Sequence, residues 1–299
     1  MNHVRVYTPE LNTLHSSVGG MERIPFGISR LDTTIGGGAP RGSVVLLSGE
    51  AGAGAREFVY TAATMNGLAK DGHDLFDLHY GDLARDAALP EEIHYISFTT
   101  DEDNLRREIK MTMDDDIAES GLSKVQFKSL SKNYFHISPV PRTWYAEETT
   151  DITSLRKRHE NREGLLTALG DTLSERAPGN LVIVDSLSDL AGAAGDTIPW
   201  ADVNYLLKGI VKAAHKWDGL ILIPVNHETL SGTQLGQLVD SCSGTLRFEW
   251  ETGGSTRART LVVKNFSGVL STIESENIVK FETDLGDAGF DISDVRKIR

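Results

Sequence analysis

A glycine-rich stretch at residues 49–54 follows the apolar run at residues 44–47 and precedes a helical pattern. Strand, glycine loop and helix in this order make an anion-binding site, because backbone N–H groups at the start of the helix point toward the ligand. A complete nucleotide loop of spacing G-x4-G continues with Lys and then Ser or Thr. After Gly54 this chain has Ala55 and Arg56, so the loop lacks the phosphate-binding lysine and the magnesium-binding hydroxyl.

Arg56 is the one cation beside the loop in the sequence, since the next lysine is Lys70. Its guanidinium could reach back to a phosphate, but it stands where the magnesium ligand belongs and would repel the metal. Glu50 adds a negative charge inside the loop, and we expect it to pair with Arg56 and hold the loop without a ligand. The sequence therefore predicts no metal site. The expected cofactor is none, or else ATP, ADP or a simple anion bound without Mg²⁺.

Asp185 ends a second apolar run at residues 181–184. Ligands bind at the carboxyl ends of the strands in open α/β sheets, so this carboxylate could face a nucleotide. The alternative is a structural aspartate that caps the following turn. No residue is predicted to be catalytic. If a nucleotide or anion binds, the residues expected to contact it are Gly49, Gly52, Ala53, Gly54, Ala55, Arg56 and Asp185.

The elements that position these residues alternate between strand and helix. Short apolar runs predict buried parallel strands at residues 44–47, 94–98, 134–138, 181–184 and 220–225. Helical patterns occupy residues 55–69, 102–118, 162–176 and 201–217. Later strands, without helices between them, are expected at residues 245–250, 259–264 and 277–282. The fold class is therefore α/β: a doubly wound, mostly parallel sheet flanked by helices, with antiparallel C-terminal strands.

The chain has no obvious linker, so residues 23–285 are expected to form a single domain. Residues 1–22 are mixed and polar and predict a flexible N-terminal arm. Residues 286–299 predict a polar C-terminal tail. The polar, acidic composition of residues 72–92 predicts an insertion on the surface. The histidines and aspartates in this stretch match no metal-ligand spacing, which favours a solvated loop over a metal site.

Composition favours a cytoplasmic protein. The 43 acidic and 30 basic residues give a net charge of −13, with 12 lysines against 18 arginines. Acid-rich, lysine-poor chains are typical of salt-rich cells, so the expected source is a halophilic archaeon. The single cysteine, Cys242, cannot form an internal disulfide and indicates a reducing compartment. Neither a signal peptide nor a run of 18 apolar residues is found, which predicts no membrane insertion.

Several stretches resemble a known family. The lead-in at residues 24–43, IPFGISRLDTTIGGGAPRGS, and the glycine loop after it resemble the opening of KaiC-like domains in the RecA-type ATPase superfamily. The segment NLVIVDS resembles the Walker B strand of that family, and residues 240–268 resemble its C-terminal hairpins. The resemblance covers about residues 23–285. It implies a RecA-type core that forms rings or filaments with nucleotide at subunit interfaces.

The resemblance also implies which positions an active member needs. The family's glutamate pair after the second strand corresponds to Thr99 and Thr100, and threonine cannot take a proton from water at neutral pH. The late cationic motif K-x-R-G keeps Lys264 but has Phe266 in place of the arginine. Together with the two losses in the loop, four of five parts are missing or changed, and Asp185 remains. The resemblance therefore implies a degenerate P-loop protein, a pseudo-ATPase.

We therefore expect a non-catalytic regulatory or assembly protein of signal transduction or motility. It would act as a homo-oligomer or with a protein partner. The first alternative is a weak ATPase that uses Arg56 together with Asp101 or Glu102. The second is a recombinase-like DNA-binding paralogue. It is disfavoured, because the two loops that would face DNA, near residues 191–199 and 228–244, lie within residues 177–207 and 217–246, which contain no Lys or Arg.

Overall fold

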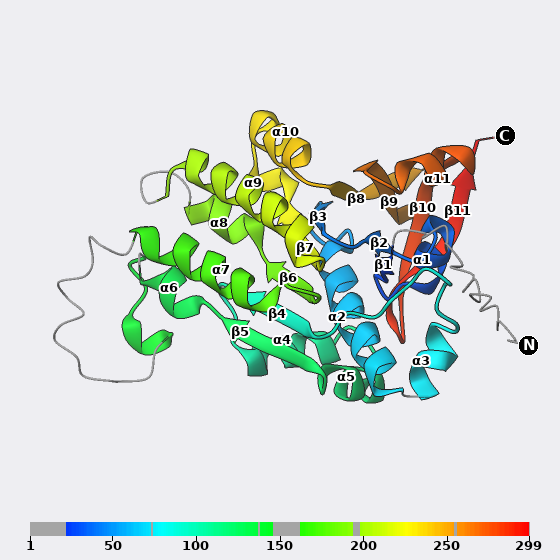
Figure 1. The fold of residues 1–299 in the computed structure, drawn as a ribbon, viewed down its shortest axis with the longest axis horizontal. Helices are drawn as coiled ribbons and strands as arrows, with labels where there is room; N and C mark the ends of the chain where they lie inside the picture. The colour runs from blue at the N-terminus through cyan, green and yellow to red at the C-terminus, as the bar shows by residue number, and fades with distance from the viewer. Residues whose placement is uncertain are drawn as a thin grey trace, which may run out of the picture.

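A nine-stranded sheet organises the residues that the computed structural model describes, which are 22–72, 74–136, 138–145, 162–193, 198–253 and 256–298. Its order is β11-β10-β9-β8-β3-β7-β6-β4-β5 (Figure 1). Strands from β8 to β5 run parallel, and β9, β10 and β11 extend the sheet antiparallel. The strands are β3 (Ser43–Gly49), β4 (Ile93–Ser97), β5 (Val125–Ser129), β6 (Leu181–Asp185), β7 (Leu220–Asn226), β8 (Gly244–Gly253), β9 (Thr256–Phe266), β10 (Ile278–Gly286) and β11 (Gly289–Lys297), with a short pair β1 (Arg23–Ile24) and β2 (Ala39–Pro40) beside them.

Helices bury both faces of this sheet (Figure 1). In β3, Val45 and Leu47 belong to one apolar cluster while Val44 and Leu46 belong to the other, which confirms the expected α/β fold class. The first cluster includes residues of α1 (Ser29–Ile35), α2 (Ala55–Asp71), α3 (Asp74–His79), α4 (Glu102–Lys110), α5 (Asp115–Leu122) and α11 (Leu270–Ser275). The second includes residues of α7 (Arg162–Arg176), α8 (Leu187–Ala193), α9 (Trp200–Trp217) and α10 (Gly232–Ser241), and Tyr134 of α6 (Ser131–Phe135) packs against it.

Two expected elements are different in the structure. The strand predicted at residues 134–138 is wrong, because helix α6 covers the first part of this range. The edge strand of the sheet is β5 instead. Its sequence is VQFKS, and Val125 is its one buried residue. The single helix predicted at residues 102–118 is two helices. The break between them follows from Asp114, whose side chain accepts the N–H of Asp116 and begins α5.

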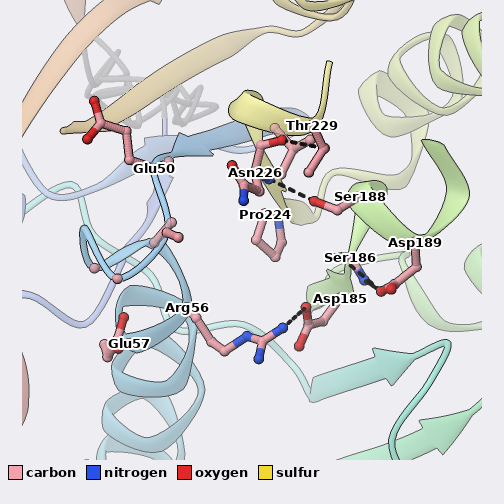
Figure 2. Close-up of a pocket in the computed structure, with 16 residues that line it drawn as sticks. Glu50, Arg56, Glu57, Asp185, Ser186, Ser188, Asp189, Pro224, Asn226 and Thr229 are labelled. Atoms are coloured by element: carbon pink, nitrogen blue, oxygen red, sulfur yellow. Dashed lines mark hydrogen bonds and ion pairs between the residues drawn. The ribbon is translucent and has the colours of Figure 1, made fainter. Parts of the chain in front are cut away.

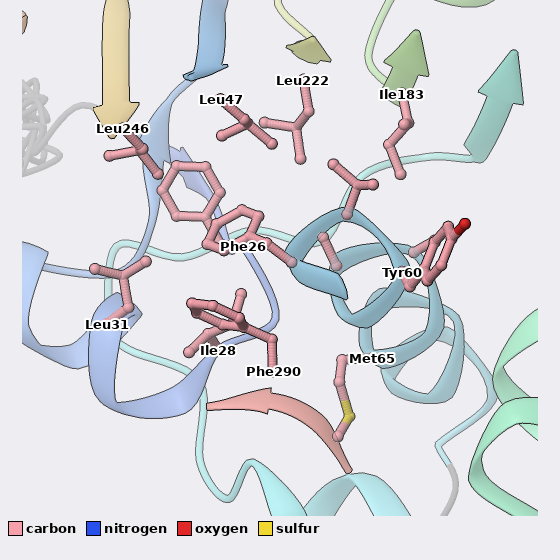
Figure 3. Packing of buried hydrophobic residues seen from close by; sticks show 14 of the residues in the cluster. Phe26, Ile28, Leu31, Leu47, Tyr60, Met65, Ile183, Leu222, Leu246 and Phe290 are labelled. Carbon is pink, nitrogen blue, oxygen red and sulfur yellow. The ribbon is translucent and has the colours of Figure 1, made fainter. Parts of the chain in front are cut away.

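The prediction of a polar tail at residues 286–299 is also wrong, because residues 289–297 form strand β11. Residue 299 lies outside the described residues. Strand β11 pairs with β10 as a hairpin, and its Phe290 (Figure 3) and Ile292 are buried in the core. The backbone N–H of Phe290 donates to Thr61 Oγ1 at 2.8 Å, which fastens the hairpin to α2. Alternate apolar residues face inward here, as in any half-buried strand. The predicted arm lies outside the described residues apart from Glu22.

A buried carboxylate orders the lead-in to β3. Asp32 accepts the backbone N–H groups of Phe26, Gly27 and Ile28 at 2.9, 2.9 and 3.2 Å, and the hydroxyl of Tyr80 at 3.0 Å. Burial raises the pKa of Asp32 to about 7, against the opposite effect of these four bonds. Tyr80 comes from the stretch predicted as a surface insertion, so that stretch contributes to the core network.

Helices α2 and α5 cross in close contact at two glycines. A Cβ placed on Gly67 would come 2.1 Å from the carbonyl oxygen of Gly121. A Cβ on Gly121 would come 2.4 Å from the carbonyl oxygen of Thr64. No side chain fits between two backbones at this distance, so the crossing requires glycine on both helices. It fixes α5 against the helix that follows the glycine loop.

His94 is a buried histidine between Arg176 and the exposed Glu92, at the opposite end of β4 from the glycine loop. Its Nδ1 lies 3.2 Å from Arg176 Nη1 and its Nε2 lies 3.1 Å from Glu92 Oε2. Arginine can only donate, so Nδ1 accepts and Nε2–H donates to the carboxylate, which defines a neutral imidazole. Burial and then Arg176 lower the pKa of His94, against the opposing effect of Glu92.

His94 should make stability fall in mild acid. The unfolded chain binds a proton at this histidine below about pH 6.5 while the folded chain still resists it. From pH 7.5 to 5.5, the free energy of unfolding should therefore fall more in the native protein than in a His94→Gln variant, by up to about 1.4 kcal/mol per pH unit. Urea titrations at each pH measure the difference between the two proteins. The contribution of Asp32 to the pH dependence cancels in this comparison, because Asp32 is present in both. An equal dependence of the unfolding free energy on pH in the two proteins would contradict the prediction that His94 resists protonation in the folded state.

Candidate functional site

The carboxyl ends of β3, β6 and β7 surround a pocket of about 450 Å³ (Figure 2). This is where the sequence placed the site, since the glycine loop follows β3 and Asp185 ends β6. The pocket is open on one side, and its wall combines backbone, acidic side chains and one guanidinium. It is lined by Gly49, Glu50, Ala51, Gly52, Gly54, Ala55, Arg56, Glu57, Asp185, Ser186, Ser188, Asp189, Pro224, Val225, Asn226 and Thr229. Of the predicted contact residues, only Ala53 is absent from this lining, because it is buried in the core.

The glycine loop keeps the backbone shape of an anion cradle. Gly52 and Gly54 have φ angles of 72° and 111°, a region that favours glycine, and α2 begins directly after Gly54. The first helical bond runs from Phe58 N–H to the Gly54 carbonyl at 2.8 Å. The N–H groups of residues 55–57 therefore have no acceptor within the helix and face the pocket end of α2.

The outer side of the loop is fastened by residues that sequence reasoning missed. Trp250 Nε1 donates to the Ala51 carbonyl at 3.1 Å, and Arg259 Nε donates to the Gly52 carbonyl at 2.9 Å. The Ala51 N–H donates to Glu228 Oε2 at 3.1 Å. Their sequence signal is weak, because they follow the loop by about 180 to 210 positions and match no spacing rule; only the alternation of Trp and Arg on a hairpin hints at a shared face.

Two arginines, Arg257 and Arg259, make cation–π contacts with the ring of Trp250. The guanidinium of Arg257 lies 3.8 Å from the centre of the Trp250 ring, and that of Arg259 lies 4.5 Å away. Cation–π contacts of this kind stabilise by about 0.5–1 kcal/mol at exposed sites. The β8–β9 hairpin therefore supports the glycine loop as a preformed unit.

Arg56 pairs across the pocket with Asp185, which corrects the expected partner. The Arg56 Nη2 atom lies 4.0 Å from Asp185 Oδ1, and Figure 2 shows the guanidinium pointing at that carboxylate. Glu50 instead points away from the pocket, and its Oε2 accepts the backbone N–H of Trp250 at 3.3 Å. The predicted Glu50–Arg56 pair is therefore wrong. Strand β8 lies beside β3 and offers Glu50 the nearer donor.

Asp185 is buried and held from both sides. Its Oδ2 accepts the hydroxyl of Tyr95 at 2.8 Å. Burial raises the pKa of Asp185, while Arg56 and Tyr95 act against the increase. Burial also raises the pKa of Tyr95, so the phenol stays protonated and remains a donor. This aspartate is thus part of an ion pair with hydrogen bonding, and the turn after it is capped separately by Asp189 on Ser186.

The residues present do not fit a magnesium ion. A nucleotide-bound Mg²⁺ needs oxygen ligands from the protein, and position 56 supplies a guanidinium that faces the remaining carboxylate. Ser186, which directly follows β6, donates its hydroxyl to Asp189 at 2.8 Å. Within the described ranges, no group of three or more His, Cys, Asp or Glu residues could hold a metal.

The substitutes proposed for the missing base are engaged elsewhere. Asp101 caps α4 by accepting the Asn104 N–H at 2.9 Å, and Glu102 pairs with Arg106 at 2.8 Å. Neither lines the pocket. Besides Asp185, the acid whose charge acts on Arg56 is Glu108, which accepts the hydroxyl of Tyr60 at 2.9 Å and which the sequence did not single out.

Phe266, in the position of the family's arginine, is a core residue. It is 1% exposed, and its ring centre lies 6.3 Å from that of Phe26. A Cβ on the facing Gly244 would meet the Phe266 ring at 2.5 Å, so the two residues fit as a pair. Lys264 is exposed on β9. This strand therefore presents no arginine at position 266, and the aromatic ring there stabilises the fold.

Comparison with solved structures defines the class of fold. Among others, the chain is similar to a KaiC-like protein, PH0186, from the hyperthermophilic archaeon Pyrococcus horikoshii OT3. The TM-score is 0.56 at 14% sequence identity, and the match covers 92% of this chain and 100% of that one. No family model matches the chain, and no curated protein matches it in sequence. At this identity the likeness shows the fold alone, an α/β fold of the KaiC-like, RecA type.

In the described part of the chain, no helix is long and apolar enough to cross a bilayer.

The second region expected to face DNA in a recombinase, residues 228–244, is largely ordered as α10, which begins at the capping box of Ser231 and Gln234. The first, residues 191–199, lies partly outside the described residues.

Proposed function

We propose that this chain is a non-catalytic protein of KaiC-like fold that regulates or assembles other components in signal transduction or motility. One observation carries the proposal: the Arg56 guanidinium faces Asp185, where a catalytic site would hold Mg²⁺. A cation built into the chain neutralises the carboxylate without a metal. The fold is thereby kept while the hydrolytic chemistry is removed.

Four further residues support the loss of hydrolysis. Ala55 offers no ammonium group to phosphates, and such charge-assisted bonds contribute about 1.5–3 kcal/mol each. Thr99 and Thr100 cannot act as a general base. Phe266 is enclosed in the core and cannot stabilise charge on a transferred phosphoryl group. These losses lie on different elements, so no single local change would restore activity.

The setting of the protein is part of the same proposal. The acid-rich composition supports a salt-rich, cytoplasmic environment and a halophilic archaeal source. The KaiC-like fold supports self-assembly or a protein partner in signalling or motility. Charge disfavours DNA as a ligand, since residues 177–207 and 217–246 carry no Lys or Arg for phosphate contacts.

Purified protein in molar KCl with Mg²⁺ and ATP is expected to release phosphate no faster than its Asp185→Ala variant. A phosphate-release assay measures both rates under the same conditions. The matched control is the double change Ala55→Lys with Arg56→Thr, which restores the lysine and the hydroxyl and should gain Mg²⁺-dependent ADP stabilisation in a thermal melt. Turnover by the native chain that disappears on Asp185→Ala would refute the proposed function.

A further inference from the structure

The Arg56–Asp185 pair crosses an open pocket and is held loosely. Its 4.0 Å separation is at the outer limit of an ion pair, and the Arg56 side chain is 59% exposed against 10% for Asp185. Figure 2 shows the guanidinium extending from the first turn of α2 into the space between the strand ends. An entering anion would therefore meet the guanidinium and the free N–H groups of that turn together.

Asp185 depends on Arg56 for its negative charge. The titratable groups that face it in the described chain are Arg56 and Tyr60 from α2, Tyr95 from β4, Asp189 from α8 and Glu108 from α4. Arg56 is the one cation in this set. If Arg56 turned to another anion, a buried carboxylate would remain beside two like charges, a state that burial makes costly. Protonation removes that cost.

We propose that the pocket binds a phosphate group without a metal ion, and that Arg56 leaves Asp185 for this phosphate while Asp185 takes up one proton. The inference rests on the proposed function, because a carboxylate that held Mg²⁺ would stay ionised. The proton comes from solvent and binds Oδ1, the oxygen that Arg56 vacates. Oδ2 keeps the hydrogen bond from Tyr95, and no bond between heavy atoms forms or breaks.

The test is isothermal titration calorimetry of two ligands in EDTA, inorganic phosphate and ADP. Each titration is run at one pH in two buffers that differ in ionisation enthalpy, which counts the protons taken up. The native protein should take up about one proton more per ligand than Asp185→Asn, since protons belonging to the ligand cancel between the two proteins. Asp185→Asn should bind more tightly, because Arg56 is then free. Arg56→Gln should bind at least about tenfold more weakly.

The two ligands distinguish the source of the phosphate group. ADP binding at least tenfold more tightly than inorganic phosphate would assign a nucleotide, and equal affinities would assign free phosphate or a simple ester; both outcomes support the site. Equal proton counts in native protein and Asp185→Asn would overturn the inference. Native affinity in Arg56→Gln, or no binding of either ligand, would also overturn it.

A second measurement does not depend on the folding of Asp185→Asn. Sulfate does not titrate between pH 6 and 8, so its affinity for the native protein should fall with rising pH, by up to tenfold per unit for one linked proton. Arg56→Gln should show no such dependence, and a flat profile in the native protein would contradict the linkage. Phosphate release from ATP tests the proposed function separately, because it reads turnover and not proton uptake.

Discussion

Replacing Asp32 by alanine is expected to reduce the free energy of unfolding by about 3–5 kcal/mol, enough to unfold many domains. Three backbone N–H groups and the Tyr80 hydroxyl donate to this carboxylate inside the core. Alanine leaves these buried donors without an acceptor, and each orphaned group costs about 1–3 kcal/mol, partly relieved by relaxation. Urea denaturation followed by circular dichroism measures the loss.

The matched control for Asp32 is Tyr80→Phe, which removes one of the four donors and keeps the carboxylate. It should cost only about 0.5–1.5 kcal/mol, the net value of one hydrogen bond. A loss below 1 kcal/mol in Asp32→Ala would show that the lead-in turn holds its shape without the carboxylate.

Gly67→Ala is expected to destabilise the protein by at least about 2 kcal/mol, although alanine is the better helix former by about 1 kcal/mol. The added methyl would sit 2.1 Å from the backbone oxygen of Gly121, and backbone cannot rotate away as a side chain can. Helices α2 and α5 must separate to admit it, which opens the core around both. Thermal and urea denaturation measure the change.

The control for the helix crossing is Gly170→Ala in α7, a helical glycine with no atom within 4 Å of an added Cβ. This change should be neutral or stabilising by up to about 1 kcal/mol, because only helix propensity acts. Equal effects at Gly67 and Gly170 would contradict the close crossing.

The central sheet was predictable because its strands are buried on both faces. Strands β3, β6 and β7 are largely continuous apolar runs, a composition typical of parallel strands covered on both faces. The edges were not. Strand β5 has one fully buried residue, Val125, and in β11 charged residues outnumber Phe290 and Ile292. At an edge, one face meets solvent and the local pattern resembles a loop.

The candidate site was predictable where neighbours in sequence are neighbours in space. The glycine loop and Asp185 converge as expected, since parallel strands bring their carboxyl ends together. Charge partners were not predictable in this way. Glu50 turned to Trp250, 200 positions away, because β8 lies beside β3 in the sheet. Long-range contacts of this kind follow from strand order, which local composition does not encode.

The fastening of the glycine loop by Trp250, Arg259 and Glu228 has a thermodynamic consequence. Glycines have the greatest conformational entropy to lose, and a free loop would lose it only when a ligand arrived. Here that loss accompanies folding, since the hairpin and Glu228 order the loop through their own hydrogen bonds. A ligand therefore meets a preorganised surface, and its affinity is not reduced by the ordering of the loop. Weakening the hairpin contacts would transfer that entropy cost to the binding step.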